Sequence, residues 1–160
     1  MACFLPTLIL RHKKENTKKC SLRSLETQKD FVFISYPAPI LPDLTHYCML
    51  TLDAPPLSKK EADLGILLID GTWRYAEKMV ASVLKRGPVI TRSLPGNAET
   101  AYPRCQTGCI DPKKGLASIE ALYIAFLLTG RSTQGLLDGY YWQEEFLQKN
   151  HSLSVEDLGE

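Results

Sequence analysis

The segment 65–73, which reads GILLIDGTW, constrains the fold more than any other part of the chain. Its apolar residues follow one another without alternation, as in parallel strands that are covered on both faces. We expect this strand to end at Asp70, to turn at Gly71, and to lead into a helix at Trp73. Ligands of α/β proteins bind where strand ends face helix starts. An acid, a hydroxyl and an indole within four residues therefore predict a site for a charged, partly apolar small molecule.

The rest of the chain alternates strand-like and helix-like segments, which favours an α/β fold with a mainly parallel sheet flanked by helices. Strands are predicted over residues 7–10, 31–35, 47–52, 66–69 and 89–91. Helices are predicted over residues 21–28, from residue 58, and over 72–86, 117–128 and 133–149. A long irregular stretch, 92–116, precedes the apolar helix, and loops of this length are often functional.

The 160 residues predict a single domain. Within it we distinguish a basic N-terminal portion (1–55), a portion that carries the expected site (56–150) and a flexible acidic tail (151–160). No apolar run approaches the roughly 20 residues that cross a bilayer, and the N-terminus lacks the basic start of a signal peptide.

Several chemical classes are disfavoured by the motifs that the chain lacks. The five cysteines are scattered and odd in number, so they do not form the pattern of a disulfide framework. Their arrangement fits a reducing cytoplasm. The one close pair, Cys105 and Cys109, lacks the spacing of a zinc site, so we expect no metal. The glycine-rich fingerprints of dinucleotide sites and P-loops are also absent.

Basic residues are concentrated near the N-terminus, although the net charge is only +1. Between residues 11 and 23, six basic side chains accompany a single acid, Glu15. Such an edge is typical of a surface that contacts RNA phosphates, and a solvated basic turn is the alternative interpretation. The candidate RNA contacts are Arg11, Lys13, Lys14, Lys18, Lys19, Arg23, Arg74, Arg92 and Arg104.

Four segments, the third of them in two parts, resemble in this order the motifs of one family. Residues 18–25 (KKCSLRSL) resemble a basic opening motif, and residues 70–73 (DGTW) an acid-x-hydroxyl-Trp signature. Residues 92–95 (RSLP) resemble an R-x-L-P loop, and residues 116–121 (LASIEA) resemble an L-S-x-x-E-A helix start. Residues 141–150 (YWQEEFLQKN) resemble a closing helix. The set resembles the small-subunit rRNA aminocarboxypropyltransferases of ribosome biogenesis. It resembles more distantly the DTW-domain family, which makes the same transfer to tRNA uridine.

The resemblance implies a SPOUT-like α/β fold with a trefoil knot in its C-terminal part, and S-adenosylmethionine as the donor. Such enzymes move the 3-amino-3-carboxypropyl group to N3 of a uridine or pseudouridine-type nucleotide and release methylthioadenosine. The partner that it implies is rRNA or the pre-ribosomal small subunit. We also expect a cytoplasmic protein, and a monomer is favoured over an oligomer. A tRNA target, a SPOUT methyltransferase and a catalytically silent RNA-binding assembly factor are the alternatives.

The same resemblance implies donor contacts at Ser21, Leu57, Asp70, Trp73, Leu94, Leu116, Ala117 and Ser118. The helix start at 117–118 would supply N–H groups and a positive helix end to the donor carboxylate. The loop leucines would bind adenine and ribose through their backbone, and the Trp73 indole would face the sulfonium. Each residue also has an ordinary interpretation as a helix cap or a core side chain, and the sequence does not separate the two.

Asp70 is the candidate catalytic residue, because the acceptor N3 carries a proton that must leave. An ordinary aspartate pKa of about 3.9 is several units below that of a uridine imide, so an unperturbed carboxylate is a poor base. Either burial raises this pKa or Asp70 chiefly holds the reactants in line; an acid that caps the next helix is the structural alternative. Glu120 is expected to be structural and to accept hydrogen bonds from loop N–H groups or Arg92.

Overall fold

The structure is a computed structural model, and it describes residues 4–14, 21–38, 40–102 and 115–153. Within these ranges the chain forms a five-stranded sheet in the order β2-β1-β4-β3-β5, and every pair of neighbours is parallel. The strands are β1 (Thr7–His12), β2 (Phe31–Tyr36), β3 (Tyr47–Leu50), β4 (Gly65–Asp70) and β5 (Ile90–Arg92). The predicted α/β class with a parallel sheet is confirmed.

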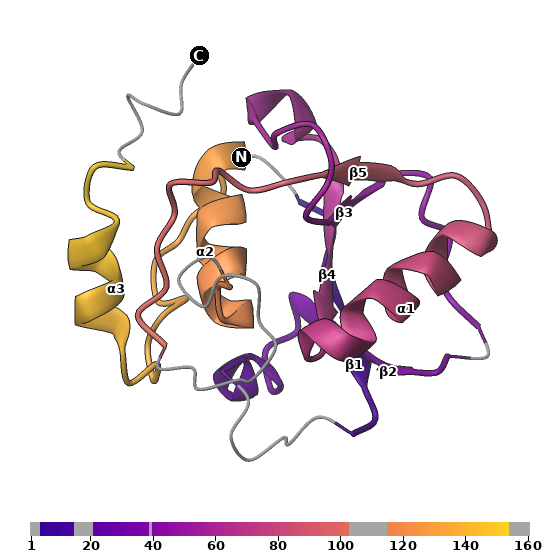
Figure 1. Cartoon of the computed structure of the whole chain (residues 1–160), viewed down its shortest axis with the longest axis horizontal. Coiled ribbons are helices and arrows are strands. Elements are labelled where there is room, and N and C mark those ends of the chain that lie inside the picture. The colour runs from indigo at the N-terminus through magenta and orange to yellow at the C-terminus, as the bar shows by residue number, and fades with distance from the viewer. Residues whose placement is uncertain (1–3, 15–20, 39, 103–114, 154–160) are drawn as a thin grey trace.

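Helices cover both faces of this sheet (Figure 1). The α-helices are α1 (Trp73–Lys85), α2 (Ser118–Thr129) and α3 (Gln143–Lys149), and two short 3-10 turns are η1 (Arg23–Leu25) and η2 (Lys59–Glu61). Helix α1 lies on one side of the strands, whereas α2 lies on the other, with α3 beyond it. No helix in the described part of the chain is long and apolar enough to span a membrane.

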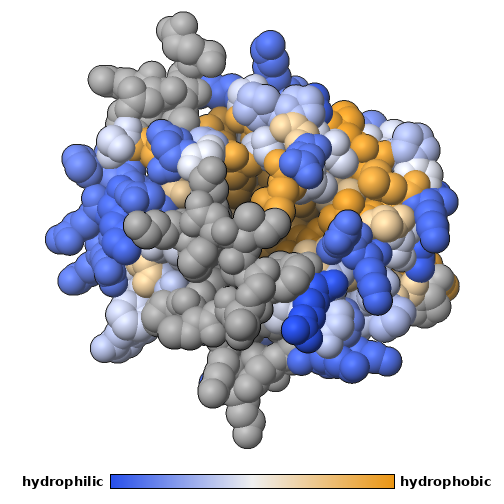
Figure 2. Space-filling view, in the orientation of Figure 1, coloured by the Kyte–Doolittle hydropathy of each residue, from blue (hydrophilic) through white to orange (hydrophobic). Residues whose placement is uncertain are grey.

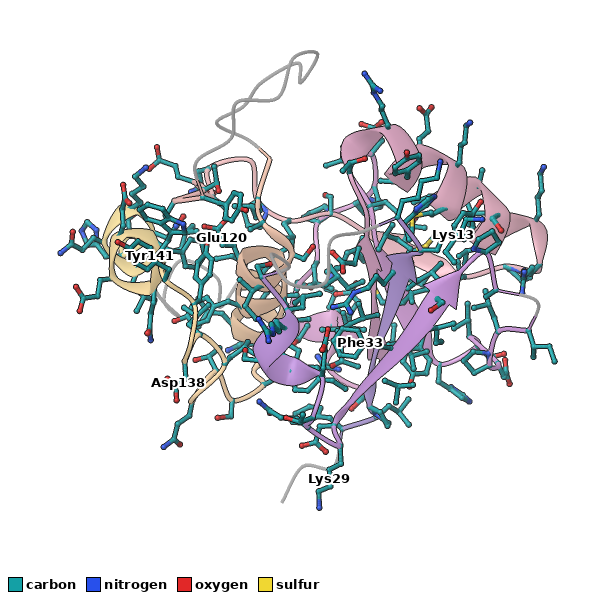
Figure 3. All side chains as sticks on the ribbon, turned by 90° about the horizontal axis from the view of Figure 1, so that it is seen from below. Lys13, Lys29, Phe33, Glu120, Asp138 and Tyr141 are labelled. Atoms are coloured by element: carbon teal, nitrogen blue, oxygen red, sulfur yellow. The ribbon has the colours of Figure 1, made fainter. Side chains whose placement is uncertain are left out.

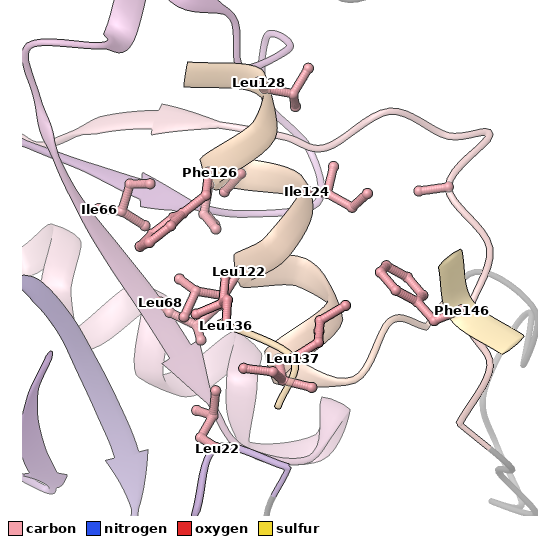
Figure 4. Close-up of a cluster of buried hydrophobic side chains, with 14 of the residues drawn as sticks. Leu22, Ile66, Leu68, Leu122, Ile124, Phe126, Leu128, Leu136, Leu137 and Phe146 are labelled. Carbon is pink, nitrogen blue, oxygen red and sulfur yellow. The ribbon is translucent and has the colours of Figure 1, made fainter. Parts of the chain in front are cut away.

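Neighbouring residues of the central strands enter different cores because side chains alternate along a strand. Ile66 and Leu68 of β4 join the cluster around α2, and Leu67 joins the cluster around α1. Figure 4 shows Ile66 and Leu68 facing the α2 side chains, with Phe146 of α3 on the outer side of that helix. Burial on both faces is the reason why the sequence of β4 is apolar without alternation.

The prediction of one long helix over residues 133–149 is wrong. The structure has turns up to residue 142 and a helix only from Gln143 to Lys149. Gly135 and Gly139 adopt φ values of 76° and 84°, a left-handed conformation that ends regular helix. The expected helix at 21–28 is likewise only the turn η1.

Two further findings concern which residues are packed. Within α1, Leu84 is 45% exposed, whereas Met79 and Val83 are buried. The tail expected to begin at residue 151 is packed at least as far as Leu153, which is 5% exposed. Residues 154–160 lie outside the described ranges.

Gly65 offers a test of the packing between β3 and β4. A Cβ atom on this residue would lie 2.7 Å from two ring carbons of Tyr47, whose hydroxyl donates to the Pro6 carbonyl. We expect Gly65→Ala to lower the free energy of unfolding by about 1–3 kcal/mol, as overpacking usually does. Gly96→Ala is the matched control, since nothing lies within 4 Å of its added Cβ. Equal urea unfolding midpoints for both variants would contradict this account.

Candidate functional site

The connections of the sheet diverge between β1 and β4. Strand β1 continues to β2 through η1, whose Leu25 is buried in the α2 cluster, and β4 continues to β5 through α1 on the opposite face. Such a switch point opens a crevice at the carboxyl ends of the two strands, where open α/β sheets bind ligands. Arg11 and Asp70 are register partners at this place.

The Asp70 carboxylate joins three elements at the switch point. It is 3% exposed, and its Oδ1 accepts a hydrogen bond from the Ser118 hydroxyl at 2.7 Å. Its Oδ2 accepts from Arg11 Nε at 3.1 Å. The end of β4 is thereby tied to the end of β1 and to the first residue of α2, two segments far away in the sequence.

Arg11 has an internal role in place of the phosphate contact that the sequence predicted. Its guanidinium also donates to Glu26 Oε1 at 2.7 Å and lies 4.5 Å from the centroid of the Phe33 ring. The side chain is 12% exposed and bridges two carboxylates. Arg92 is similarly engaged, with Nε 2.6 Å from Glu61 Oε1, so neither arginine presents an unpaired cation to RNA.

The start of α2 is capped by a hydroxyl from another part of the chain. Ala117 carries no side-chain acceptor, and Ser21 Oγ accepts the Ile119 N–H at 3.1 Å across 98 residues of sequence. Ser21 was expected either to contact the donor or to cap the helix after it, and the helix that it caps is α2, much later in the chain. Its hydroxyl hydrogen can still donate to a ligand, because a hydroxyl both accepts and donates.

Glu120 is a structural residue, as expected. Of the two kinds of partner that were expected, it binds loop N–H groups and not Arg92. It is fully buried, and its Oε1 accepts from Thr100 Oγ1 at 2.6 Å and the Ala117 N–H at 2.7 Å. Its Oε2 accepts from the Ala101 N–H at 2.8 Å and the Tyr140 hydroxyl at 3.0 Å. One carboxylate thus holds the loop after β5, the start of α2 and the turn before α3 together.

The three loop leucines of the expected donor site pack around the same apolar cluster. Leu57 is buried in it, and Leu94 and Leu116 lie against it. The Leu57 N–H is already bonded to the Ser93 carbonyl at 2.8 Å, and the Ala117 N–H to Glu120, so neither is available to a ligand. The Leu94 N–H has no hydrogen-bond partner within the described ranges, which leaves it as the available amide of this group.

A hollowed, apolar area occupies the middle of the face seen in Figure 2. The backbone of Trp73 opens α1 with Thr72 as its N-cap, but the position of the indole lies outside the described part of the structure. Of the expected RNA contacts, the side chains of Lys13, Lys14, Arg23 and Arg74 are exposed, and Lys18, Lys19 and Arg104 lie outside the described residues.

His12 lies in the same region and is absent from the residues that the sequence predicted for the site. It is buried, its Nδ1 accepts the Lys14 N–H at 3.1 Å, and its ring stacks on Tyr75 at 3.9 Å between centroids. Burial, followed by the charges of Lys14 and Lys13, lowers the pKa of His12 below its ordinary value. Its position two residues after the predicted strand 7–10, and thus near a strand end, was the signal that could have drawn attention to it.

No group of three or more His, Cys, Asp or Glu side chains within the described residues could hold a metal ion. Cys48 is buried, and burial raises the pKa of its thiol to about 11, which makes it unreactive at neutral pH.

A comparison with known proteins agrees with this geometry. No family model and no curated protein matches the chain. A solved structure of the SAM-dependent rRNA:acp-transferase Tsr3 from Vulcanisaeta distributa is similar, with a TM-score of 0.69 and 20% sequence identity. The likeness covers 96% of this chain and 82% of that one. The chain has the Tsr3 fold. The family resemblance of the sequence motifs is therefore confirmed at the level of the fold.

Glu120 provides a test of this framework. Glu120→Gln replaces an acceptor oxygen by an NH₂ group that faces two donors, and an unsatisfied buried donor costs about 1–3 kcal/mol. We expect the free energy of unfolding to fall by at least that amount in urea titrations. Glu144→Gln, at an exposed position of α3, is the control and should change little. Equal stability of the two variants would show that the four hydrogen bonds do not hold the loop.

Proposed function

We propose that this protein transfers the 3-amino-3-carboxypropyl group of S-adenosylmethionine to N3 of a uridine or pseudouridine-type nucleotide in small-subunit rRNA. One observation carries the proposal: three of the segments that resemble the family meet at the switch point. Ser21 bonds the first turn of α2, and Ser118 of that turn bonds Asp70. The Tsr3 structure with the same fold is that of an rRNA acp-transferase that depends on the same donor.

In the proposed site the donor lies across the crevice between the loop leucines and Asp70. Its carboxylate faces the start of α2, where the helix dipole and the Ser21 hydroxyl favour an anion. The adenine lies against Leu57, Leu94 and Leu116, with the Leu94 N–H as its backbone donor. The sulfonium lies at Asp70, which is consistent with the attraction of a carboxylate for a cation. The contact with the Trp73 indole that the family resemblance implies stays a prediction.

The proposed reaction needs little covalent chemistry from the protein. The N3 lone pair attacks the carbon next to the sulfonium, the carbon–sulfur bond breaks, and its electrons leave with methylthioadenosine. The N3 proton leaves to Asp70 or to water. Two fixed hydrogen bonds orient the Asp70 carboxylate before the reactants arrive, and such preorganisation is a main source of catalytic rate.

We also propose that the C-terminal part forms a SPOUT-type knot and that the partner is rRNA of the small subunit. The proposed location is the cytoplasm, and the proposed state is a monomer. Among the expected phosphate contacts, Lys13, Lys14, Arg23 and Arg74 are exposed and fit this role. A tRNA target is the alternative substrate, and methyl transfer and a catalytically silent assembly factor are the outcomes that the next experiment would distinguish.

The reaction is tested with Asp70→Asn. We expect donor binding, measured by calorimetry, to persist and methylthioadenosine release to fall at least about hundredfold, the usual scale of a lost acid–base or orienting group. Asp53→Asn, at an exposed position, is the control. Wild-type turnover by a correctly folded Asp70→Asn would refute the role of Asp70. Release of adenosylhomocysteine would indicate a methyltransferase, and absence of donor binding an assembly factor.

The RNA interface is tested by salt dependence. Each phosphate contact to a single strand contributes about −0.7 to the slope of log K against log salt. We expect Lys13→Gln and Arg74→Gln each to reduce the slope by about that amount in fluorescence anisotropy titrations. Lys29→Gln is the control, because Lys29 lies far from Lys13 in Figure 3. Affinity that does not change between low and physiological salt would contradict this interface.

A further inference from the structure

Three aromatic rings form a row beside the switch point. His12 occupies the centre, with the Tyr75 ring 3.9 Å away at an interplanar angle of 15° and the Tyr36 ring 5.5 Å away at 36°. The central ring is buried, whereas both tyrosines at the ends of the row are partly exposed. The three rings come from the carboxyl ends of β1 and β2 and from the first turn of α1.

The row touches the backbone that follows Asp70. A Cβ atom placed on Gly71 would lie 3.5 Å from the Cβ of His12 and 3.7 Å from that of Tyr75. His12 also follows Arg11, the ion-pair partner of Asp70, in β1. The inner part of the row is thus packed against the turn that follows β4.

Cations surround this row. The Lys14 ammonium lies 6.0 Å from the centroid of the Tyr75 ring, and Lys13 is exposed beside it. Arg74 and Lys78 are exposed one turn apart on α1, so they share a face of that helix. Glu77 is the exposed acid of the same segment, and it leaves the local charge positive. Aromatic rings flanked by basic side chains are the pattern by which proteins bind single-stranded nucleic acid.

We propose that the row Tyr36–His12–Tyr75 is a stacking platform for an unpaired base of the RNA, with Lys13, Lys14, Arg74 and Lys78 on the adjoining phosphates. The identity of that base as the acceptor of the transfer rests on the proposed function, whereas the binding of single-stranded RNA does not. The platform lies at the same carboxyl edge of the sheet as Asp70, on the face that α1 covers. The lowered pKa of His12 is consistent with this role, since a neutral ring adds no buried charge to the stack.

The test measures binding of a short fluorescent single-stranded RNA that contains uridine, without donor. We expect Tyr75→Leu to weaken binding about 5- to 150-fold, the range found when a stacking side chain is removed. Tyr75→Phe keeps the ring and should stay within about twofold. Tyr141→Leu is the distant aromatic control, because Tyr141 is 85% exposed and lies at the opposite end of the molecule from Lys13 (Figure 3).

A second probe separates stacking from electrostatics. The same RNA with one abasic position should bind the wild-type protein more weakly, whereas Tyr75→Leu should no longer distinguish the two probes. Tyr36→Leu repeats the test at the other end of the row if Tyr75→Leu melts at a lower temperature. Unchanged affinity of both leucine variants, or an equal loss in Tyr75→Phe, would overturn the platform.

The stacking platform and the proposed transfer reaction can be refuted independently of each other. Donor affinity of the tyrosine variants, measured by calorimetry, should equal that of the wild type, because the donor lies on the α2 side of Asp70 in the proposal. A protein that binds RNA through the platform but releases no methylthioadenosine would retain the platform and lose the proposed transfer. A protein that releases methylthioadenosine with unchanged kinetics in both leucine variants would retain the transfer and lose the platform.

Discussion

The Asp70 carboxylate is the interaction on which the arrangement of the site depends. It accepts one hydrogen bond from β1 and another from the start of α2, two elements that are far apart in the sequence. Removing one partner of a buried ion pair commonly costs 3–5 kcal/mol, because the remaining charge stays desolvated. Here Arg11 retains Glu26 when Asp70 is neutralised, so an Asp70→Asn protein keeps a partner for its guanidinium.

The sheet could be predicted from the sequence because its central strands are buried on both faces. Their continuous apolar runs, bounded by Gly and Pro, identify them without knowledge of the tertiary structure. The predicted strand 66–69 is found as Gly65–Asp70, and the predicted helix 117–128 as Ser118–Thr129. The helix predicted over residues 133–149 was wrong because Gly135 and Gly139, whose φ values are left-handed, interrupt the helix-forming residues there.

The site was predictable only in part. The acid at the strand end and the helix start at 117–118 followed from local patterns and from the family resemblance. The pairing of Arg11 with Asp70 could not be predicted, because it depends on the strand order that places β1 beside β4. A basic side chain near a cluster of lysines is naturally interpreted as a phosphate contact, and only the register shows that it faces inward. The stack of His12 on Tyr75 depends on the same strand order.

The ion pairs around Asp70 also bear on how a cationic donor could be held. A carboxylate neutralised by one guanidinium would attract a sulfonium weakly. Arg11, however, is shared between Asp70 and Glu26, so these two ion pairs set two carboxylates against one guanidinium. The Glu26 side chain is 35% exposed, so water screens its charge, whereas the Asp70 carboxylate is buried and its charge is screened much less. In the proposed site the negative charge that faces a sulfonium is therefore mainly that of Asp70, whose oxygens Ser118 and Arg11 hold in place.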